Sequence, residues 1–226
     1  MFLNLIHQKN DLNNPHAFFY FDLFKGIQLT PDSIESGDSQ YGEHYRLASN
    51  FQFTIKVLLT APKDFRVSLG KDARLYFLPN QNFIHGIVNT IQGPAEERGG
   101  FLYTFTLMSS LGLLKYQYYS RVFYQVDIRD IVQALIDSHN ELGGPIIKIR
   151  FNLYKSHPIV TQWAQHEQNT LDFLHLSLFH FGVSYYFEHS KSSSTIVFID
   201  SFSFYPKINP ENIDYTDLAG AKDNLA

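Results

Sequence analysis

Histidine is the residue type in this chain with the most obvious capacity for chemistry. The sequence has ten histidines and no cysteine, which excludes disulfides, thiolate catalysis and cysteine-based zinc sites. His175 and His180 fall in a predicted helix, where a spacing of five residues separates them by about 140° around the axis. They cannot hold one metal ion on that helix alone, and the zinc-protease pattern H-E-x-x-H is absent. We therefore expect the histidines to be scattered over surfaces and barrel walls, with no metal site.

Glu188 and His189 form the second pair of residues that invites a catalytic interpretation. They end the stretch FGVSYYFEH (181–189), most of which we predict to be a strand. Consecutive strand residues point to opposite faces, so this carboxylate and this imidazole are poorly placed to act together as acid and base. The packed face of the strand is expected to carry Val183, Tyr185 and Phe187. We assign Glu188 and His189 no catalytic role.

The remaining catalytic patterns are missing. There is no G-x-S-x-G nucleophile elbow, and the serines at 192–194 lie in a predicted hairpin loop. The glycine pairs in ERGG (97–100) and LGGP (142–145) match neither the Walker A loop nor the dinucleotide-binding fingerprint. His85 is expected on the polar face of a strand. We predict a protein that is not an enzyme, with no catalytic, cofactor-binding or metal-binding residues and no cofactor. A hydrolase with an unrecognised triad remains an alternative, because geometry and not sequence order defines a triad.

Composition sets the class of protein. The chain has 226 residues, of which 44% are hydrophobic and 16% aromatic, enough for a sizeable core and typical of strand-rich proteins. The net charge of -4 gives no basic footprint for nucleic acid, so we expect no nucleic-acid partner. No apolar run is long enough to span a bilayer, and the first residues, MFLNLIHQKND, lack the basic region of a signal peptide.

The first half of the chain is predicted to consist of strands. FQFTIKVLL (51–59) alternates apolar and polar residues, the pattern of a half-buried strand. GPAEERGG (93–100) is predicted to be a loop. Further strands are expected within AFFYFDLFKGIQL (17–29), ARLYFL (73–78), FIHGIV (83–88) and FLYTFTLM (101–108). Several short strands separated by turn residues predict a barrel or a sandwich.

Two helices are predicted after residue 120. VDIRDIVQALIDSHN (126–140) has one apolar stripe at helical spacing, with Asp127 as its N-cap. A second helix is expected to begin near Asn169 and to end at Gly182, which allows a left-handed C-cap. LDFLHLSLFHF within it is apolar nearly all round, which predicts burial between layers. STIVFIDSF (194–202) is expected to pair with the strand in 181–189.

Four of these stretches, in this order, resemble the VgrG family, the spike proteins of the type VI secretion system. They are FIHGIV, YTFTLMSSLGLLKYQYYSRVF (103–123), VDIRDIVQALI and LDFLHLSLFHFGVSYYFEH. The family has a strand ending in F-x-G-I-V, an L-x-L-L run leading into S-R-I-F, a short helix, and a D-F-L helix leading into G-I-x-Y-x-F-E-H. The N-terminal region of this family is similar to the baseplate hub protein of contractile phages. One departure is Gly112, since the family commonly has tryptophan there.

The resemblance implies an α+β, mainly β fold with two barrel-like hub domains. The first would span residues 1–115, and the second, carrying both helices, residues 116–202. Residues 203–226 would be a tail or the start of a returning segment of a longer protein.

The resemblance also implies a structural function. Three chains would form a pseudo-hexameric ring that adapts a six-fold tube to a three-fold needle. The implied partners are two further copies in a homotrimer, an Hcp-like tube protein, baseplate components and effector proteins. The protein would assemble in the bacterial cytoplasm and then be ejected into the extracellular space or a target cell, and this part of it would not insert into a membrane.

A second class of function stays open. Tyr116, Tyr118 and Tyr119 are candidates for an aromatic patch in an all-β module that binds a glycan or a protein. That alternative predicts a concave, exposed aromatic surface.

Overall fold

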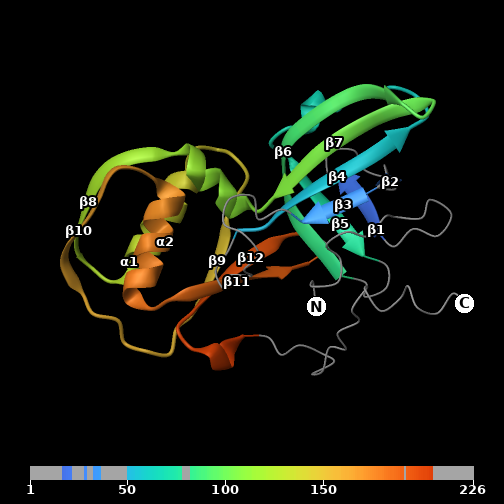
Figure 1. The fold of residues 1–226 in the computed structure, drawn as a ribbon. Coiled ribbons are helices and arrows are strands. Elements are labelled where there is room, and N and C mark those ends of the chain that lie inside the picture. The colour runs from blue at the N-terminus through green and yellow to red at the C-terminus, as the bar shows by residue number, and fades with distance from the viewer. Residues whose placement is uncertain are drawn as a thin grey trace, which may run out of the picture.

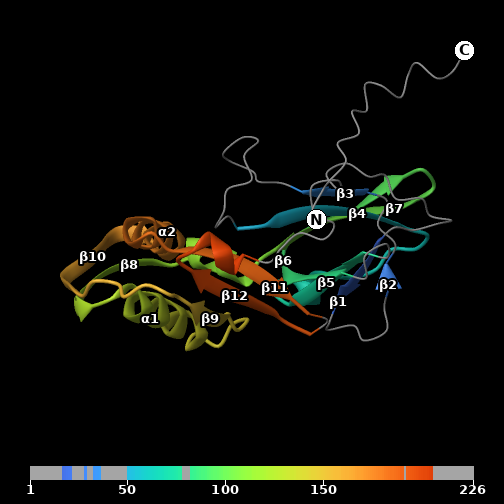
Figure 2. The ribbon, with the colours of Figure 1, turned by 90° about the horizontal axis from the view of Figure 1, so that it is seen from below.

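The structure is a computed structural model and describes residues 17–21, 28–29, 33–36, 50–77, 82–190 and 192–205. Two groups of elements lie side by side, strands β1 to β7 on one side and all later elements on the other (Figures 1 and 2). We call residues up to Met108 the sheet half and residues from Ser109 the helical half. The tail predicted for residues 203–226 lies outside the described residues from position 206 onward.

The sheet half is one seven-stranded sheet in the order β2-β1-β5-β6-β7-β4-β3, with all neighbours antiparallel. β2 and β3 end this order, and no pairing joins them among the described strands. The division at residue 115 into two barrel domains therefore stays a prediction. The strands are Ala17–Phe21 (β1), Gln28–Leu29 (β2), Ser33–Ser36 (β3), Gln52–Leu59 (β4), Asp72–Phe77 (β5), Asn82–Glu97 (β6) and Gly100–Met108 (β7).

The loop predicted over residues 93–100 is wrong. β6 continues to Glu97 and β7 begins at Gly100, so the segment is the tip of a long hairpin. The turn is made by Arg98 and Gly99, both with positive φ (49° and 75°), as tight hairpin turns require. Gly, Pro and charged residues in the sequence favoured a loop, but cross-strand pairing extends the strands through them.

The alternation predicted for residues 51–59 is confirmed by burial. Ile55 and Val57 are buried in β4, and they pack into a core rich in aromatic rings. Phe105 is fully buried, with its ring centroid 5.2 Å from that of Phe65 and 5.6 Å from that of Phe19. Such tilted and edge-to-face pairs add to the stabilisation that burial alone provides. The core fixes the strands that position the surface facing the helical half.

The two predicted helices are confirmed. α1 (Ile128–Asn140) begins with a capping box in which Asp127 accepts from the backbone N–H of Asp130, and the Asp130 carboxylate accepts from the N–H of Asp127. α2 (Thr170–Phe181) is capped by Asn169, whose side chain accepts from the N–H of Asp172, and ends at Gly182 with φ 67°.

The strands of the helical half form two small sheets. Strands β8 (Tyr118–Val126) and β10 (Val160–Asn169) form an antiparallel two-stranded ribbon. The other sheet has the order β11-β12-β9, from strands Ser184–His189, Ser194–Ile199 and Lys148–Asn152. The predicted pairing of residues 181–189 with 194–202 is confirmed, since β11 and β12 are antiparallel. Short 3-10 helices span Arg66–Ser68, Ser110–Tyr116 and Phe202–Phe204.

The prediction that α2 is buried all round is wrong for one side. Phe173 and Leu174 are fully buried, but Leu176 is 51% exposed and Phe179 is 85% exposed. The helix therefore packs one face against α1 and the ribbon and leaves a second apolar face uncovered in the single chain.

Gly86 in β6 is required because another backbone lies against it. A Cβ built at this position would be 2.5 Å from the carbonyl oxygen of Met108 and 3.1 Å from the Leu107 side chain. No real Cβ contact is that short, and the clashing atom belongs to a paired strand that cannot yield easily. This explains physically why the FIHGIV stretch has glycine at its fourth position.

We expect Gly86→Ala to destabilise the protein by about 1–3 kcal/mol, because it over-packs a rigid site. Gly144→Ala is a matched control, since a Cβ there meets no atom within 4 Å. Urea unfolding followed by circular dichroism measures both. Equal stability of the two variants would contradict the close-approach explanation.

Candidate functional site

The surface on which the two halves meet is built from aromatic rings. Phe51, just before β4, lies edge-on to Phe187 and His189 of β11, with ring centroids 5.0 Å and 5.2 Å apart. Phe187 and His189 stack on each other at 5.9 Å, because alternate residues of a strand share a face. We call Phe51, His85, Phe187 and His189 the junction.

His189 is held as a neutral imidazole at the junction. Its Nδ1 accepts a hydrogen bond of 3.3 Å from the backbone N–H of His85. Burial, helped by the nearby His85, lowers the pKa of His189 to about 4, since desolvation disfavours the charged form. The expected position of His85 on a polar face is wrong, because its side chain is 7% exposed and belongs to this contact between halves.

Glu188 points away from His189, as predicted. It is exposed and pairs with Arg150 of β9, with 2.6 Å between Oε1 and Nη2, and it accepts from the Tyr186 hydroxyl at 3.2 Å. The carboxylate and the imidazole therefore act on opposite faces of β11. The Glu-His sequence thus connects β11 to β9 on one face and to Phe51 on the other.

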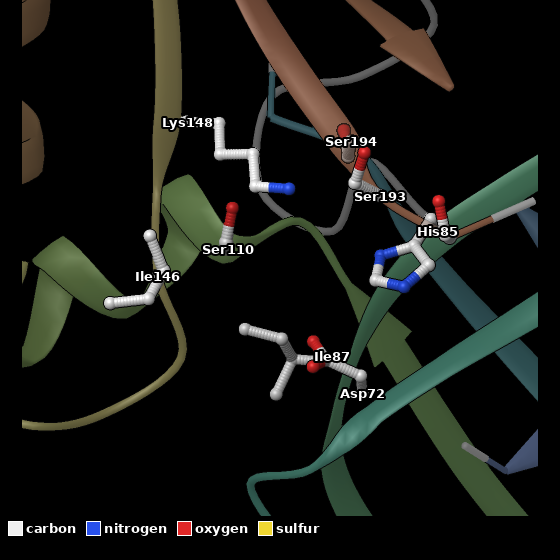
Figure 3. Close-up of a pocket in the computed structure, with 10 residues that line it drawn as sticks. Asp72, His85, Ile87, Ser110, Ile146, Lys148, Ser193 and Ser194 are labelled. Carbon is white, nitrogen blue, oxygen red and sulfur yellow. The ribbon is translucent and has the colours of Figure 1, made fainter. Parts of the chain in front are cut away.

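A small pocket lies beside the junction (Figure 3). Its volume is about 130 Å³, below the roughly 300–1,000 Å³ of pockets that bind small organic molecules. Figure 3 shows the amine of Lys148 and the hydroxyls of Ser110, Ser193 and Ser194 around it. The carboxylate of Asp72 lies at the opposite side, below His85 (Figure 3). The lining mixes both signs of charge and offers space for a few water molecules.

One buried imidazole–carboxylate pair resembles part of a catalytic triad. His157 Nε2 lies 3.1 Å from Asp200 Oδ2, with the two side chains 5% and 0% exposed. Asp200 also accepts from the backbone N–H groups of Tyr154 and Lys155, at 2.9 and 2.7 Å. Burial acts to raise the pKa of Asp200, but these hydrogen bonds and His157 outweigh it and hold the pKa below its ordinary value. Because no side of the carboxylate is open, the pair serves to fasten the segment after β9 to the end of β12.

The two histidines of α2 lie against aromatic residues. His175 Nε2 is 2.9 Å from the Tyr185 hydroxyl, and burial lowers the pKa of His175. His180 packs against the Trp163 ring, at 4.6 Å between centroids. His175 and His180 thus have separate surroundings. Within the described residues no group of three His, Cys, Asp or Glu side chains is placed to hold a metal ion.

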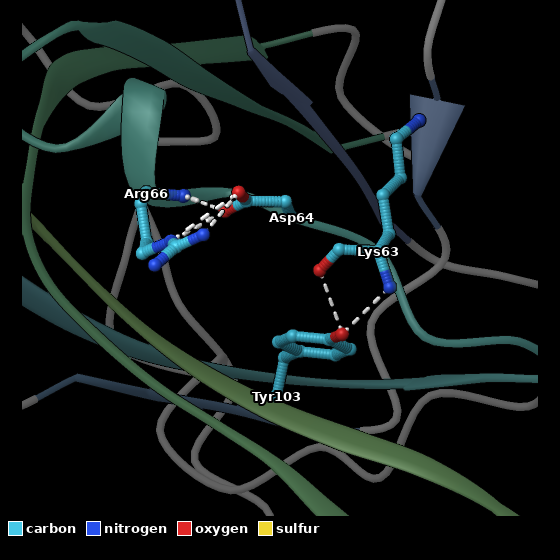
Figure 4. Close-up of polar contacts among 4 residues, drawn as sticks. All are labelled: Lys63, Asp64, Arg66 and Tyr103. Carbon is cyan, nitrogen blue, oxygen red and sulfur yellow. Dashed lines mark hydrogen bonds and ion pairs between the residues drawn. The ribbon is translucent and has the colours of Figure 1, made fainter.

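A second polar cluster lies away from the junction, in the segment after β4 (Figure 4). The Tyr103 hydroxyl accepts from the Lys63 N–H and donates to the Lys63 carbonyl, both at 2.7 Å. Asp64 pairs with Arg66 at 2.8 Å, and hydrogen bonds from Arg66 lower the pKa of Asp64 to about 2. The cluster anchors a connecting segment to the sheet, and both charged groups are exposed to solvent.

The tyrosines proposed for an aromatic binding patch do not act as a set. Tyr116 and Tyr118 are 60% and 66% exposed. Tyr119 points to the opposite face of β8, where the guanidinium of Arg121 lies 4.7 Å from its ring. Sequence reasoning missed Tyr124, which is 65% exposed and shares the Tyr118 face. Tyr118 and Tyr124 are an even number of positions apart in β8, so the alternation of a strand places them on the same face.

Solved structures show which class of fold this is. An Escherichia coli protein, c3393, matches with a TM-score of 0.65 at 15% identity, over 84% of this chain and 46% of its own. It is described as a component of the type VI secretion system with structural similarity to the T4 tail proteins gp27 and gp5. A tail protein of Neisseria meningitidis matches with a TM-score of 0.55 at 9% identity, over 80% of this chain and 50% of its own. The chain therefore has the mainly β fold of phage-tail and type VI hub proteins.

Sequence comparison then gives the family. Residues 44–224 match the model of the phage tail baseplate hub (GPD), and the chain belongs to this family.

The resemblance to VgrG proteins is confirmed by curated relatives. The type VI secretion spike protein VgrG4b of Pseudomonas aeruginosa is 24% identical over 75% of this chain and 21% of its own length. The actin cross-linking toxin VgrG1 of Vibrio cholerae is 28% identical over 87% of this chain and 17% of its own length. The chain thus spans about a fifth of the length of these relatives.

The junction makes stability dependent on pH in a defined direction. An unfolded histidine binds a proton near pH 6.5, whereas folded His189 resists protonation down to about pH 4. Between these values the unfolded state binds more protons, so the free energy of unfolding falls as the pH is lowered. We expect His189 to contribute a loss of roughly 3 kcal/mol at most across this window.

His189→Asn isolates this effect, because its side-chain oxygen can still accept from the His85 N–H but does not titrate. Urea unfolding of both proteins between about pH 7 and about pH 4.5 measures the difference in slope. Parallel pH profiles for the two proteins would contradict the buried, neutral imidazole.

Proposed function

We propose that the chain is the base of a spike in a contractile injection machine of the type VI kind, where it acts as a structural hub and not as an enzyme. The observation that carries this proposal is the family match over residues 44–224. The curated relatives support the assignment to a type VI machine, since two of them are named as type VI spike proteins.

The site geometry supports a mechanical function. Among the described histidines, His157 is buried against a carboxylate and His189 packs against rings, and the pocket beside the junction is too small for most substrates. The chain consists of two densely packed halves joined by contacts between aromatic side chains. Such packing resists deformation, as a part that transmits force requires.

In the proposed assembly three copies form a ring, in which two halves from each copy give six positions. A ring of this kind would fit a six-fold tube of an Hcp-like protein on one side and a three-fold needle on the other. Closed rings need repeated head-to-tail contacts. Baseplate components and effectors are further proposed partners, and a Francisella VgrG solved in complex with PdpA has this fold, with a TM-score of 0.53 at 13% identity.

The proposed cellular location of the protein follows from its proposed place in a contractile injection machine. The protein would assemble in the bacterial cytoplasm and leave the cell with the ejected spike. None of the described helices is long and apolar enough to cross a bilayer.

The alternative of a glycan-binding module has less support. Its tyrosines would have to line a concave surface, as binding sites do. Instead, Tyr118 and Tyr124 share the exposed face of β8, opposite to Phe123, which stacks on Phe173 of α2. The ribbon bows outward around the helices (Figure 1).

Binding to the tube tests the proposed function. We expect the purified protein to associate with the ends of tubes assembled from the tube protein of the same genome, giving capped ends in negative-stain electron micrographs. A tube protein from an unrelated phage serves as the control. Tubes that stay uncapped at saturating concentrations of the protein would contradict the proposal.

A further inference from the structure

The pocket beside the junction lies where strands from both halves begin. In the helical half, β9 begins at Lys148 and β12 at Ser194, and parallel pairing places Lys148 opposite Thr195. In the sheet half, Asp72 begins β5 and pairs with Ile87 of β6. The helical half therefore supplies an amine and hydroxyl groups to the pocket, and the sheet half supplies a carboxylate (Figure 3).

Two of the hydrogen-bond donors in this pocket have no partner within the described part of the chain. Ser194 Oγ is buried and makes no hydrogen bond to any described residue. Buried hydroxyls of this kind are rare in folded proteins, because burial removes their hydrogen bonds to water. The Lys148 amine joins no ion pair or hydrogen bond with the described residues either, and Figure 3 shows it among the hydroxyls of Ser110, Ser193 and Ser194. These donors surround one space, which calls for an acceptor.

We propose that the pocket binds a phosphate ion. Lys148, Ser110 and Ser194 would donate hydrogen bonds to phosphate oxygens, and bonds to a charged partner are stronger than those between neutral groups. Asp72 would accept a hydrogen bond from the protonated phosphate oxygen, because an ionised carboxylate can only accept. The volume of about 130 Å³ is space for several water molecules of roughly 30 Å³ each, and so for an ion of comparable size.

The carboxylate of Asp72 decides which anion fits. At neutral pH phosphate keeps a proton on oxygen and can donate it to Asp72, whereas sulfate has no proton to donate. A sulfate ion held by Lys148 would face the negative charge of Asp72 with no hydrogen bond between them, and like charges repel. The pocket is therefore expected to select phosphate over sulfate. A metal cation fits less well, because the Lys148 amine is itself a cation.

A phosphate ion in this pocket would connect the two halves of the chain. It would contact Lys148 and Ser194 on one side and Asp72 on the other, beside the aromatic contacts of the junction. A ligand that binds only the folded chain raises its stability in proportion to the logarithm of the ligand concentration. The proposed phosphate site does not depend on the ring, so either proposal can fail without the other.

Isothermal titration calorimetry of the whole chain, in a phosphate-free buffer of neutral pH and constant ionic strength, tests the site. We expect saturable binding of sodium phosphate and binding of sodium sulfate that is weaker by about tenfold or more. Lys148→Met should weaken phosphate binding by about tenfold or more, because it removes the charged donor. Lys155→Met is the matched control, since Lys155 is exposed and lies outside the pocket.

Two further variants distinguish a phosphate site from a general attraction of anions. In Asp72→Asn the amide can donate as well as accept, so we expect sulfate binding to strengthen by about tenfold while phosphate binding does not. Ser194→Ala should weaken phosphate binding, yet leave the urea midpoint unchanged when phosphate is absent, because its hydroxyl has no described partner to lose. Circular dichroism establishes that each variant is folded.

Glycerol 3-phosphate identifies the source of the phosphate. Binding equal to that of inorganic phosphate would assign the site to a phosphate monoester, and binding of inorganic phosphate alone would assign it to the free ion. The proposal is wrong if no saturable binding occurs up to about 10 mM phosphate, since the pocket then holds only water. It is also wrong if Asp72→Asn strengthens the binding of both anions alike.

Discussion

The contact of Phe51 with Phe187 and His189 sets how the two halves of this chain lie relative to each other. Each half has its own apolar core, so neither core alone fixes the angle between them. Edge-to-face rings and the hydrogen bond from the His85 backbone to His189 supply that constraint. A charge on the buried imidazole would oppose this packing, which is why the histidine is held neutral. In the proposed ring, a variable angle would prevent copies of the chain from closing at a fixed size.

The junction explains physically why several positions of the VgrG-like motifs carry the residues that they do. Phe187 and His189 of the Y-x-F-E-H motif are the side chains that meet the sheet half, and Glu188 between them braces β11 against β9 through Arg150. Gly86 allows β6 to lie against the backbone of Met108. These residues are needed for geometry, which agrees with a hub that transmits force.

The departure at Gly112 also has a structural explanation. A Cβ at this position would lie 2.6 Å from Asn50 Nδ2 and 3.1 Å from Met108 Sδ. Asn50 is hydrogen-bonded to the Ser109 hydroxyl, which in turn accepts from the N–H of Gly112. In this chain a polar network therefore occupies the space that a side chain at position 112 would need.

Local signals predicted some elements well and others not at all. α1 and α2 were predictable because Asp127, Asn169 and Gly182 mark their ends by short-range chemistry. β9 and β10 were missed because their pairing partners, β12 and β8, lie far away in the sequence. The burial of His85 was missed for the same reason, since its partner His189 is 104 residues later. The exposure of Phe179 could not be predicted, because the apolar pattern of α2 does not distinguish a face buried in the chain from one buried in an assembly.

The proposed assembly is a closed ring of three copies, with two lobes from each copy. Cryo-electron microscopy of the assembled protein tests it directly. The proposed ring should give class averages with three-fold symmetry, two lobes for each copy and an open centre. A ring with another number of copies, or an open filament, would contradict it.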